Sequence, residues 1–222
     1  DGGTDSYTGE AVTISLSASK TSKFVSAITT LLDIAGADAA TVQTNLGLPA
    51  GFDPATDNPL ETLAAQKINA KLINIIAVGE SLLEGSGLAD GSGDELVVAQ
   101  LVASIKSAKD LSDSSVIAEI LTNSALGTVA VTRVSELVSN VSSSVVNANS
   151  LVDIATDVTG IAKVQEVVLN AETGITKVVQ TAASGTSVYI ALSTAELTTS
   201  LVTADIAGNQ APIDIKLSAT SV

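Results

Sequence analysis

Carboxylates are the only common catalytic or metal-binding side chains that this sequence supplies in quantity. Its 222 residues include 24 Asp and Glu, but no His and no Cys. Without His, the chain lacks the side chain that most often transfers protons near neutral pH, and a Ser-His-Asp triad is excluded. Without Cys, disulfides, zinc–thiolate sites, iron–sulfur clusters and cysteine nucleophiles are excluded as well. The remaining chemistry is that of carboxylates that act in pairs or bind a hard cation.

Three carboxylates, Asp53, Asp57 and Glu61, lie four residues apart along the chain. A pair of carboxylates is the catalytic apparatus of most glycosidases. Sites that cleave or bind sugars usually also have aromatic platforms, and Phe52 is the only aromatic residue nearby. We therefore interpret the three carboxylates as residues that cap a turn and a helix.

A second acidic segment, residues 90–95 with the sequence DGSGDE, is similar in composition to the first half of a calcium-binding loop. An EF-hand loop requires Glu at its twelfth position, and Leu101 stands there instead. We expect Asp94 to be the N-cap of a helix, with Glu95 in the first turn, where a carboxylate is favoured by the helix dipole. The chain also lacks a P-loop, a dinucleotide-binding glycine motif and an SxxK motif.

Charge argues against nucleic acid as a partner. Ten Lys and Arg give a formal net charge of −14, and Arg133 is the only arginine. Nucleic-acid binding needs clustered cations that displace counterions, so no nucleic-acid partner is expected. The longest uncharged stretch, residues 178–195, is interrupted by Gln, Ser, Thr and Gly, so no transmembrane segment is expected either. An acidic chain rich in Ser and Thr and free of Cys is typical of an extracellular or cell-surface protein, which is the localisation we expect.

Apolar periodicity predicts helices through the middle of the chain. Short helices are expected over residues 24–36 and 38–46, because Gly36 and Gly47 are placed as C-terminal stops. Asn58-Pro59, with Glu61, is the best helix-start signal and predicts a long amphipathic helix that ends before the glycine-rich segment 84–95. The apolar face of this helix is predicted to be Leu60, Ala64, Ile68, Leu72, Ile75 or Ile76, and Leu82 or Leu83.

Further helices are predicted after this segment. Apolar residues recur at helical spacing over 97–105 and 116–121. Residues 127–183 are rich in Val and Thr, which are poor helix formers, but their apolar residues keep helical spacing and lack the strict alternation of strands. We therefore expect helices there too.

Both ends of the chain have strand patterns. Residues 10–19 alternate strictly between apolar and polar side chains, and residues 186–203 and 213–217 also indicate strands. The predicted fold class is mainly α with β at both ends, an α-helical bundle flanked by β-strands or partial β-sandwich elements. The corresponding divisions are a β segment over 1–20, a helical domain over 21–185, a β segment over 186–208, and a linker with one strand over 209–222.

The C-terminal segment NQAPIDIKLS, residues 209–218, resembles the opening of a bacterial cadherin-like repeat, with Ile213 where Thr is usual. Residues 2–11, GGTDSYTGEA, are similar to the tail of an Ig-like β module in the same class of surface proteins. Residues 27–32 and 46–48 are similar to the helices that follow such a module, with Ala27 in place of Pro. The resemblance implies a segment of a giant secreted adhesin, in which a helical domain lies between β-sandwich modules.

The same resemblance implies calcium in the linker between modules. Asp205 and Asn209 occupy the matching region and are the candidate Ca²⁺ ligands, although Ile206, Ala207 and Gly208 stand between them. No other cofactor is expected. The implied partners are neighbouring β-domains of the same protein or neighbouring subunits, together with cell-surface or biofilm partners.

The expected function is a non-catalytic structural or adhesive module that spaces or joins β-domains. One alternative is a self-assembling filament or surface-lattice subunit that exchanges its terminal strand, and another is a carbohydrate- or ligand-binding module. Three fates are open for the strand at residues 213–222. It either joins a sheet of its own chain, begins a following cadherin-like repeat, or is donated to a neighbouring subunit.

Overall fold

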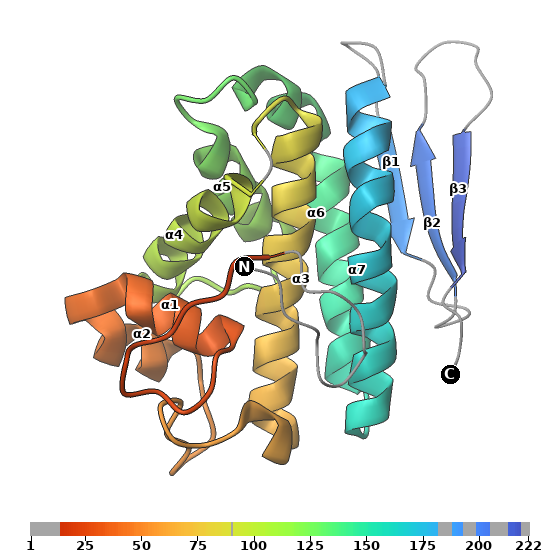
Figure 1. The fold of residues 1–222 in the computed structure, drawn as a ribbon. Helices are drawn as coiled ribbons and strands as arrows, with labels where there is room; N and C mark the ends of the chain where they lie inside the picture. The colour runs from red at the N-terminus through yellow and green to blue at the C-terminus, as the bar shows by residue number, and fades with distance from the viewer. Residues whose placement is uncertain (1–13, 90, 182–187, 193–198, 205–212, 219–222) are drawn as a thin grey trace.

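The computed structural model describes residues 14–89, 91–181, 188–192, 199–204 and 213–218. The main body is an α-helical bundle (Figure 1), so the helical part of the predicted fold class is confirmed. The helices are α1 (Ala27–Ala35), α2 (Ala39–Asn45), α3 (Leu63–Gly85), α4 (Gly93–Lys106), α5 (Ser114–Ala125), α6 (Val131–Ile154) and α7 (Val158–Thr181), with short 3-10 turns η1 (Gly36–Asp38) and η2 (Pro59–Glu61).

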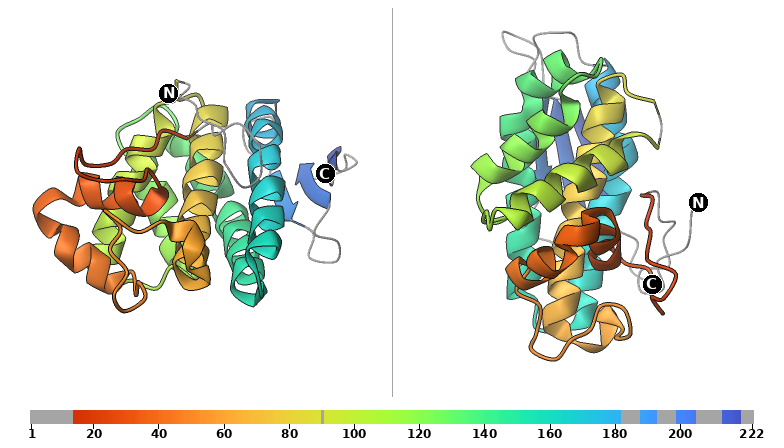
Figure 2. Two further views of the ribbon diagram at one scale, coloured as in Figure 1. Left: turned by 60° about the horizontal axis from the view of Figure 1, so that its bottom comes forward. Right: turned by 90° about the vertical axis from the view of Figure 1, so that its left-hand side faces the viewer.

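Helix α3 occupies the centre of the bundle. It contacts α6 and α7 on one side and α4 on the other, and α5 packs on α4 and α6. The short helices α1 and α2 lie against α4 at the outer edge (Figures 1 and 2). Helices α3 and α7 run in the same direction, whereas α6 runs opposite to both (Figure 1).

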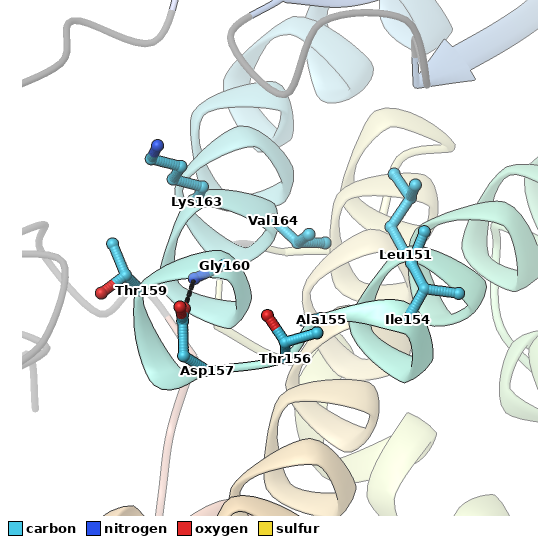
Figure 3. A pocket seen from close by; sticks show the side chains of 9 residues that line it. All are labelled: Leu151, Ile154, Ala155, Thr156, Asp157, Thr159, Gly160, Lys163 and Val164. Atoms are coloured by element: carbon cyan, nitrogen blue, oxygen red, sulfur yellow. Dashed lines mark hydrogen bonds between the residues drawn. The ribbon is translucent and has the colours of Figure 1, made fainter.

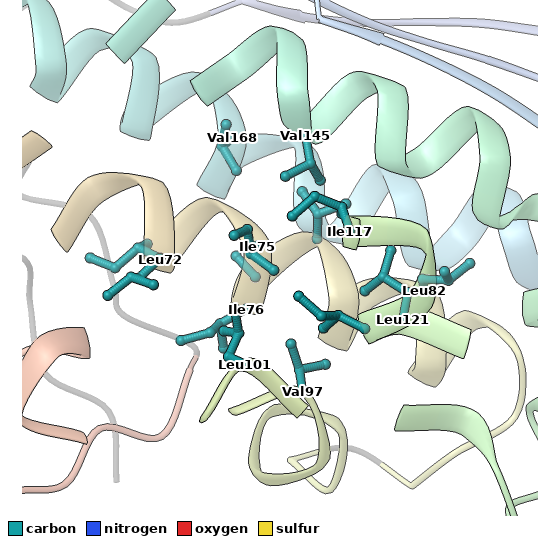
Figure 4. Packing of buried hydrophobic residues seen from close by; sticks show 14 of the residues in the cluster. Leu72, Ile75, Ile76, Leu82, Val97, Leu101, Ile117, Leu121, Val145 and Val168 are labelled. Atoms are coloured by element: carbon teal, nitrogen blue, oxygen red, sulfur yellow. The ribbon is translucent and has the colours of Figure 1, made fainter. Parts of the chain in front are cut away.

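Among the residues that the structure describes, the core cluster is continuous through the bundle and consists of Ala, Val, Ile and Leu. Figure 4 shows how α3 presents Leu72, Ile75 and Ile76 to side chains of α4, α5, α6 and α7. The largest fully buried side chains are Ile28, Leu31, Leu72, Ile75, Ile76, Leu82, Leu83, Leu101, Ile117, Ile120, Leu121 and Leu137. Burial of this aliphatic surface is the main force that holds the helices together.

Local stop and start signals explain the two short helices, which form as predicted. The Ser26 hydroxyl accepts the N–H of Thr29, and the Thr29 hydroxyl accepts the N–H of Ser26, so both ends of a capping box are present at the start of α1. Gly36 and Gly47 follow α1 and α2 with φ of +53° and +67°, in the left-handed region that favours glycine.

The long helix α3 begins later than predicted. Asn58 is a cap, because its Oδ1 accepts the N–H of Leu60 at 3.0 Å, and Pro59 follows it as expected. These residues form only the turn η2, since Thr62 has extended backbone angles, φ −125° and ψ 113°. The α-helix therefore starts afresh at Leu63.

The side chains that face the core differ from the prediction in the first turns of α3. The predicted apolar face is correct from Leu72 onward, but Ala64 is exposed and Ile68 is only half-buried. Ala65 and Ala70 are buried instead. Leu60 lies before the extended residue at position 62 and is outside the helix, whereas Ala64, Ile68 and Leu72 share one unbroken helix, so a helical period cannot show where along that helix burial begins.

Helices α6 and α7 form despite their many β-branched residues. In α6 the buried apolar residues follow helical spacing, namely Val134, Leu137, Val141, Val145, Ala148 and Val152. Such an amphipathic face gains more from burial than the weak helix propensity of Val and Thr costs. The helices predicted within residues 127–183 are therefore confirmed over 131–154 and 158–181.

The predicted strand over residues 10–19 is wrong for the part that the structure describes. Residues 14–19 have no strand structure, although Ile14 is buried and Leu16 packs against the core. The alternation of apolar and polar residues arises because this segment lies along the helices, not because it pairs with another strand. Residues 1–13 lie outside the described ranges.

At the other end, β1 (Val188–Leu192), β2 (Thr199–Ala204) and β3 (Ile213–Ser218) form an antiparallel sheet in the order β1-β2-β3. Val202 of β2 pairs with Ile190 on one side and Ile215 on the other. The sheet lies beside α6 and α7 (Figure 1). Within the described ranges, no helix combines the length and hydrophobicity needed to cross a bilayer.

Candidate functional site

The two candidate calcium ligands, Asp205 and Asn209, lie outside the residues that the structure describes. The segment between them lies outside these residues as well. Across the described part of the chain, no three Asp or Glu side chains come together as ligands for a cation. The calcium prediction at the linker therefore stays a prediction.

The carboxylates before α3 stabilise a turn, in agreement with the capping interpretation. The Asp57 carboxylate accepts the N–H of Asp53 at 2.9 Å, and the Asp53 carboxylate accepts the N–H of Ala55 at 3.0 Å. The hydroxyl of Thr56 donates to Asp53 at 3.1 Å. Glu61 is exposed in η2. The Asp53 and Asp57 carboxylates bind backbone and hydroxyl groups of their own turn, and the contact of Asp53 with the N–H of Ala55 is that of an Asx turn.

Asp94 has a different role from the predicted N-cap. Ser92 is the residue before α4, and Asp94 lies inside the first turn of that helix. Its carboxylate is fully buried and accepts the backbone N–H of Ser15 at 2.6 Å as well as that of Glu95 at 2.8 Å. A contact between residues 79 positions apart cannot be found from the local sequence, which is why the capping pattern was misleading.

A hollow of about 400 Å³ lies at the elbow between α6 and α7 (Figure 3). Leu151, Ile154 and Val164 form its apolar wall. The Asp157 carboxylate accepts the N–H of Gly160 at 2.8 Å and so caps the first turn of α7. Figure 3 shows Lys163 extending away from Leu151 and Ile154. The hollow thus has an apolar wall, and its one carboxylate already serves the helix.

A second hollow, of about 300 Å³, lies where the C-terminal end of α4 approaches α2 and α3. The Asn45 amide donates to the backbone oxygen of Ile105 at 2.8 Å and so closes the end of α4. Lys71 and Lys109 both line this hollow, but Lys71 pairs with Asp153 and Lys109 pairs with Glu119. Because both charges are paired, the lysines do not form an anion site.

A buried polar pair joins the two central helices. Nδ2 of Asn74 on α3 donates to Oδ1 of Asn149 on α6 at 3.1 Å, and the side chains are 0% and 3% exposed. Gln66 on α3 and Gln165 on α7 are also buried, and their amide nitrogens have no hydrogen-bond partner in the protein. A buried amide pair favours one register of packed helices, because a shift breaks the hydrogen bond between the two side chains, whose other amide atoms, Oδ1 of Asn74 and Nδ2 of Asn149, have no partner.

Sequence reasoning missed this pair. The available signal was Asn74 within the apolar run Ile73-Asn74-Ile75, because a helix that is apolar all round is buried on more than one face. The identity of its partner depends on the packing of α3 against α6, which the sequence pattern does not specify.

Comparison with known proteins gave no relative: no family model matches the chain, and neither curated proteins nor solved structures gave a match. The resemblance of residues 209–218 to a cadherin-like repeat therefore depends on those residues alone.

Proposed function

We propose that this chain is a non-catalytic structural or adhesive module of a large extracellular surface protein, in which it spaces or joins β-domains. The observation that carries the proposal is the helical body, whose single aliphatic core extends from Ile14 to Val179. A body with one core unfolds as a unit and holds its attachment points at a fixed separation. Spacing neighbouring domains requires this property.

The use of polar side chains supports a structural role over a binding role. Asp94, Asn74 and Thr30 are almost fully buried, and each binds another part of the same bundle. A ligand site would instead direct several polar groups toward one hollow. In the two hollows, at the α6–α7 turn and at the end of α4, Asp157 and Asn45 close helix ends, and Lys71 and Lys109 form ion pairs.

The terminal sequences support an attachment to β-domains on both sides. Residues 14–19 belong to the helical body, and β3 joins a sheet of its own chain through its pairing with β2. We propose that the chain before residue 14 continues from a preceding β module and that residues 209–222, which resemble the opening of a cadherin-like repeat, lead into a following β-domain. In this arrangement a helical bundle is flanked by β elements. The partners are then neighbouring β-domains, and the location is the bacterial cell surface or its surroundings.

Calcium in the C-terminal linker is part of this proposal, with Asp205 and Asn209 as ligands. If they bind Ca²⁺, saturating Ca²⁺ at about 100 times its dissociation constant would stabilise the folded linker by about 2.7 kcal/mol. Calorimetric titration of the full chain with Ca²⁺ measures this binding. The variant Asp205→Asn should lose the heat of binding, whereas an unchanged titration would place the ion elsewhere.

One observation favours the filament alternative. Strand β3 is at the edge of the sheet and pairs with β2 as its one partner among the described strands. An edge strand has unpaired backbone donors and acceptors and is a natural surface for pairing with another chain. A subunit could therefore add to a neighbour through β3.

Sedimentation and thermal unfolding of the full chain and of residues 1–208 separate these functions. A module gives monomers in both cases, with the same unfolding midpoint for the helical body. A filament subunit assembles as the full chain and loses assembly on truncation. A large loss of monomer stability would instead assign β3 to the core of this domain, and the modular interpretation of the C-terminal segment would then be wrong.

A further inference from the structure

Residues 14–19, which we call the N-terminal strap, are the segment by which the chain enters the bundle. Ile14 is only 2% exposed and belongs to the core cluster, and Leu16 packs against that cluster. The strap has no regular secondary structure, so its backbone groups are not satisfied by a helix or a sheet.

Side chains from two helices bind the strap backbone. The Asp94 carboxylate at the start of α4 accepts the N–H of Ser15 at 2.6 Å. The Thr30 hydroxyl of α1 accepts the N–H of Ser17 at 2.9 Å, and it lies 2.9 Å from the backbone oxygen of Ser17. Thr29 adds a contact to the same oxygen at 3.3 Å. The strap is therefore tied at two successive points to two helices of the core.

The bond to Asp94 is the stronger of the two ties. A carboxylate that accepts an N–H forms a charge-assisted hydrogen bond, which is about twice as strong as a neutral one. Asp94 is fully buried and cannot be solvated by water. Its carboxylate is stabilised instead by the N–H groups of Ser15 and Glu95 and by the dipole at the start of α4. Detaching the strap would remove one of these two donors.

We propose that the N-terminal strap is a tension-bearing attachment, through which force from the preceding part of the chain enters the bundle at Asp94 and Thr30. This inference rests on the proposed role as a spacing module. A force on the chain before residue 14 must first break the ties of Ser15 and Ser17 and extract Ile14 from the core. Only then does the load pass to the contact of the Lys23 N–H with the backbone oxygen of Ala55, at 2.8 Å, and to the start of α1.

Single-molecule pulling of the full chain tests the strap in two geometries. The sequence contains no Cys, so introduced cysteines are unique points of attachment. One geometry pulls between Asp1→Cys and Thr181→Cys, and the other between Lys20→Cys and Thr181→Cys. We expect an additional early rupture in the first geometry, and its absence in the second, because position 20 follows the strap.

Two variants assign this rupture to the named side chains. Asp94→Asn weakens the tie to Ser15, and Thr30→Val removes the hydroxyl that binds Ser17. Both should lower or abolish the early rupture in the first geometry and leave the force profile of the second geometry unchanged. Asp33→Asn is the matched control, because Asp33 contacts only the exposed hydroxyl of Ser17, at 3.1 Å. It should leave both profiles unchanged.

Several outcomes would overturn the inference. A full chain with no early rupture has no mechanical strap, and an equal force loss in both geometries means that the variants weaken the whole bundle. If Asp94→Asn does not fold, Thr30→Val decides alone, with hydrogen exchange of the Ser15 and Ser17 amides as a second measurement. The protection of these amides from exchange should fall in Thr30→Val, while the protection of the α3 amides should stay the same.

The failure of this inference can be told apart from the failure of the proposed function. A monomeric chain without the early rupture refutes the strap and leaves the proposed function intact, whereas assembly lost on truncation at residue 208 refutes the proposed function alone.

Discussion

Replacing Gly85 with Ala should measure how closely α3 approaches α7. A Cβ atom at position 85 would lie 2.6 Å from Cβ of Val179 and 2.9 Å from the backbone oxygen of Thr176. Neither atom can move away by a change of rotamer, because one is fixed to the backbone and the other belongs to it. The two helices must therefore separate to accept the methyl group.

The expected magnitude follows from two opposing terms. Overpacking of a closely packed interface costs about 1–3 kcal/mol, and the rigid contacts of Gly85 place this substitution in the upper half of that range. Ala recovers up to about 1 kcal/mol through its better helix propensity. The net loss should be about 1–2 kcal/mol, which lowers Tm by about 2–8 °C for a domain of this size.

Thermal and urea unfolding of three glycine variants provide the assay. Gly160→Ala in α7 is the comparison, because its Cβ would lie 3.3 Å from Cβ of Ala155, a longer contact than those at Gly85, and it should cost clearly less than Gly85→Ala. Gly79→Ala should be intermediate, since its Cβ would meet the side-chain ends of Leu121 and Val97 at 2.8 Å. If Gly85→Ala is as stable as Gly160→Ala, the close packing of α3 on α7 is wrong.

Further perturbations test the core, the buried amides and one helix cap. Leu72→Ala should cost about 2–5 kcal/mol in urea unfolding and Ile68→Ala clearly less, because Leu72 is 1% exposed and Ile68 half-buried; equal losses would contradict the assigned face. Asn149→Ala should cost about 1–3 kcal/mol by leaving the Asn74 amide buried and unpaired, and a neutral result would contradict the pair. The hydroxyl and N–H of Ser115 hold the pKa of Asp113 below 3.8, so its cap stabilises fully above about pH 4 and is lost as pH falls through the lowered pKa. A carboxyl NMR titration of Asp113 with a midpoint at or above 3.8 would contradict this.

Local signals in the sequence predicted local structure well. Helix α1 follows from its capping box and glycine stop, α2 follows from its glycine stop, and α6 and α7 follow from apolar spacing because burial outweighs the propensity of Val. The start of α3 was wrong because Thr62 is extended, which a helical period cannot reveal.

Tertiary contacts explain what the sequence could not predict at the candidate sites. Asp94 has the pattern of a cap, yet its partner is Ser15, far away along the chain. Asn74 is recognisable as a polar residue in an apolar run, but Asn149 becomes its partner only through the packing of α3 on α6. The alternation over residues 14–19 was interpreted as a strand because a segment lying along a helical core has the same pattern of buried and exposed residues.

The central claim is that the helical body holds its attachment points at one fixed separation. Spin labels on Lys20→Cys and Thr181→Cys measure this separation by double electron–electron resonance. Both positions are exposed, and the chain has no other Cys. We predict one narrow distance distribution that stays the same when a β-domain is fused to either end. A broad or multimodal distribution, or one that changes on fusion, would contradict the role of this chain as a spacing module.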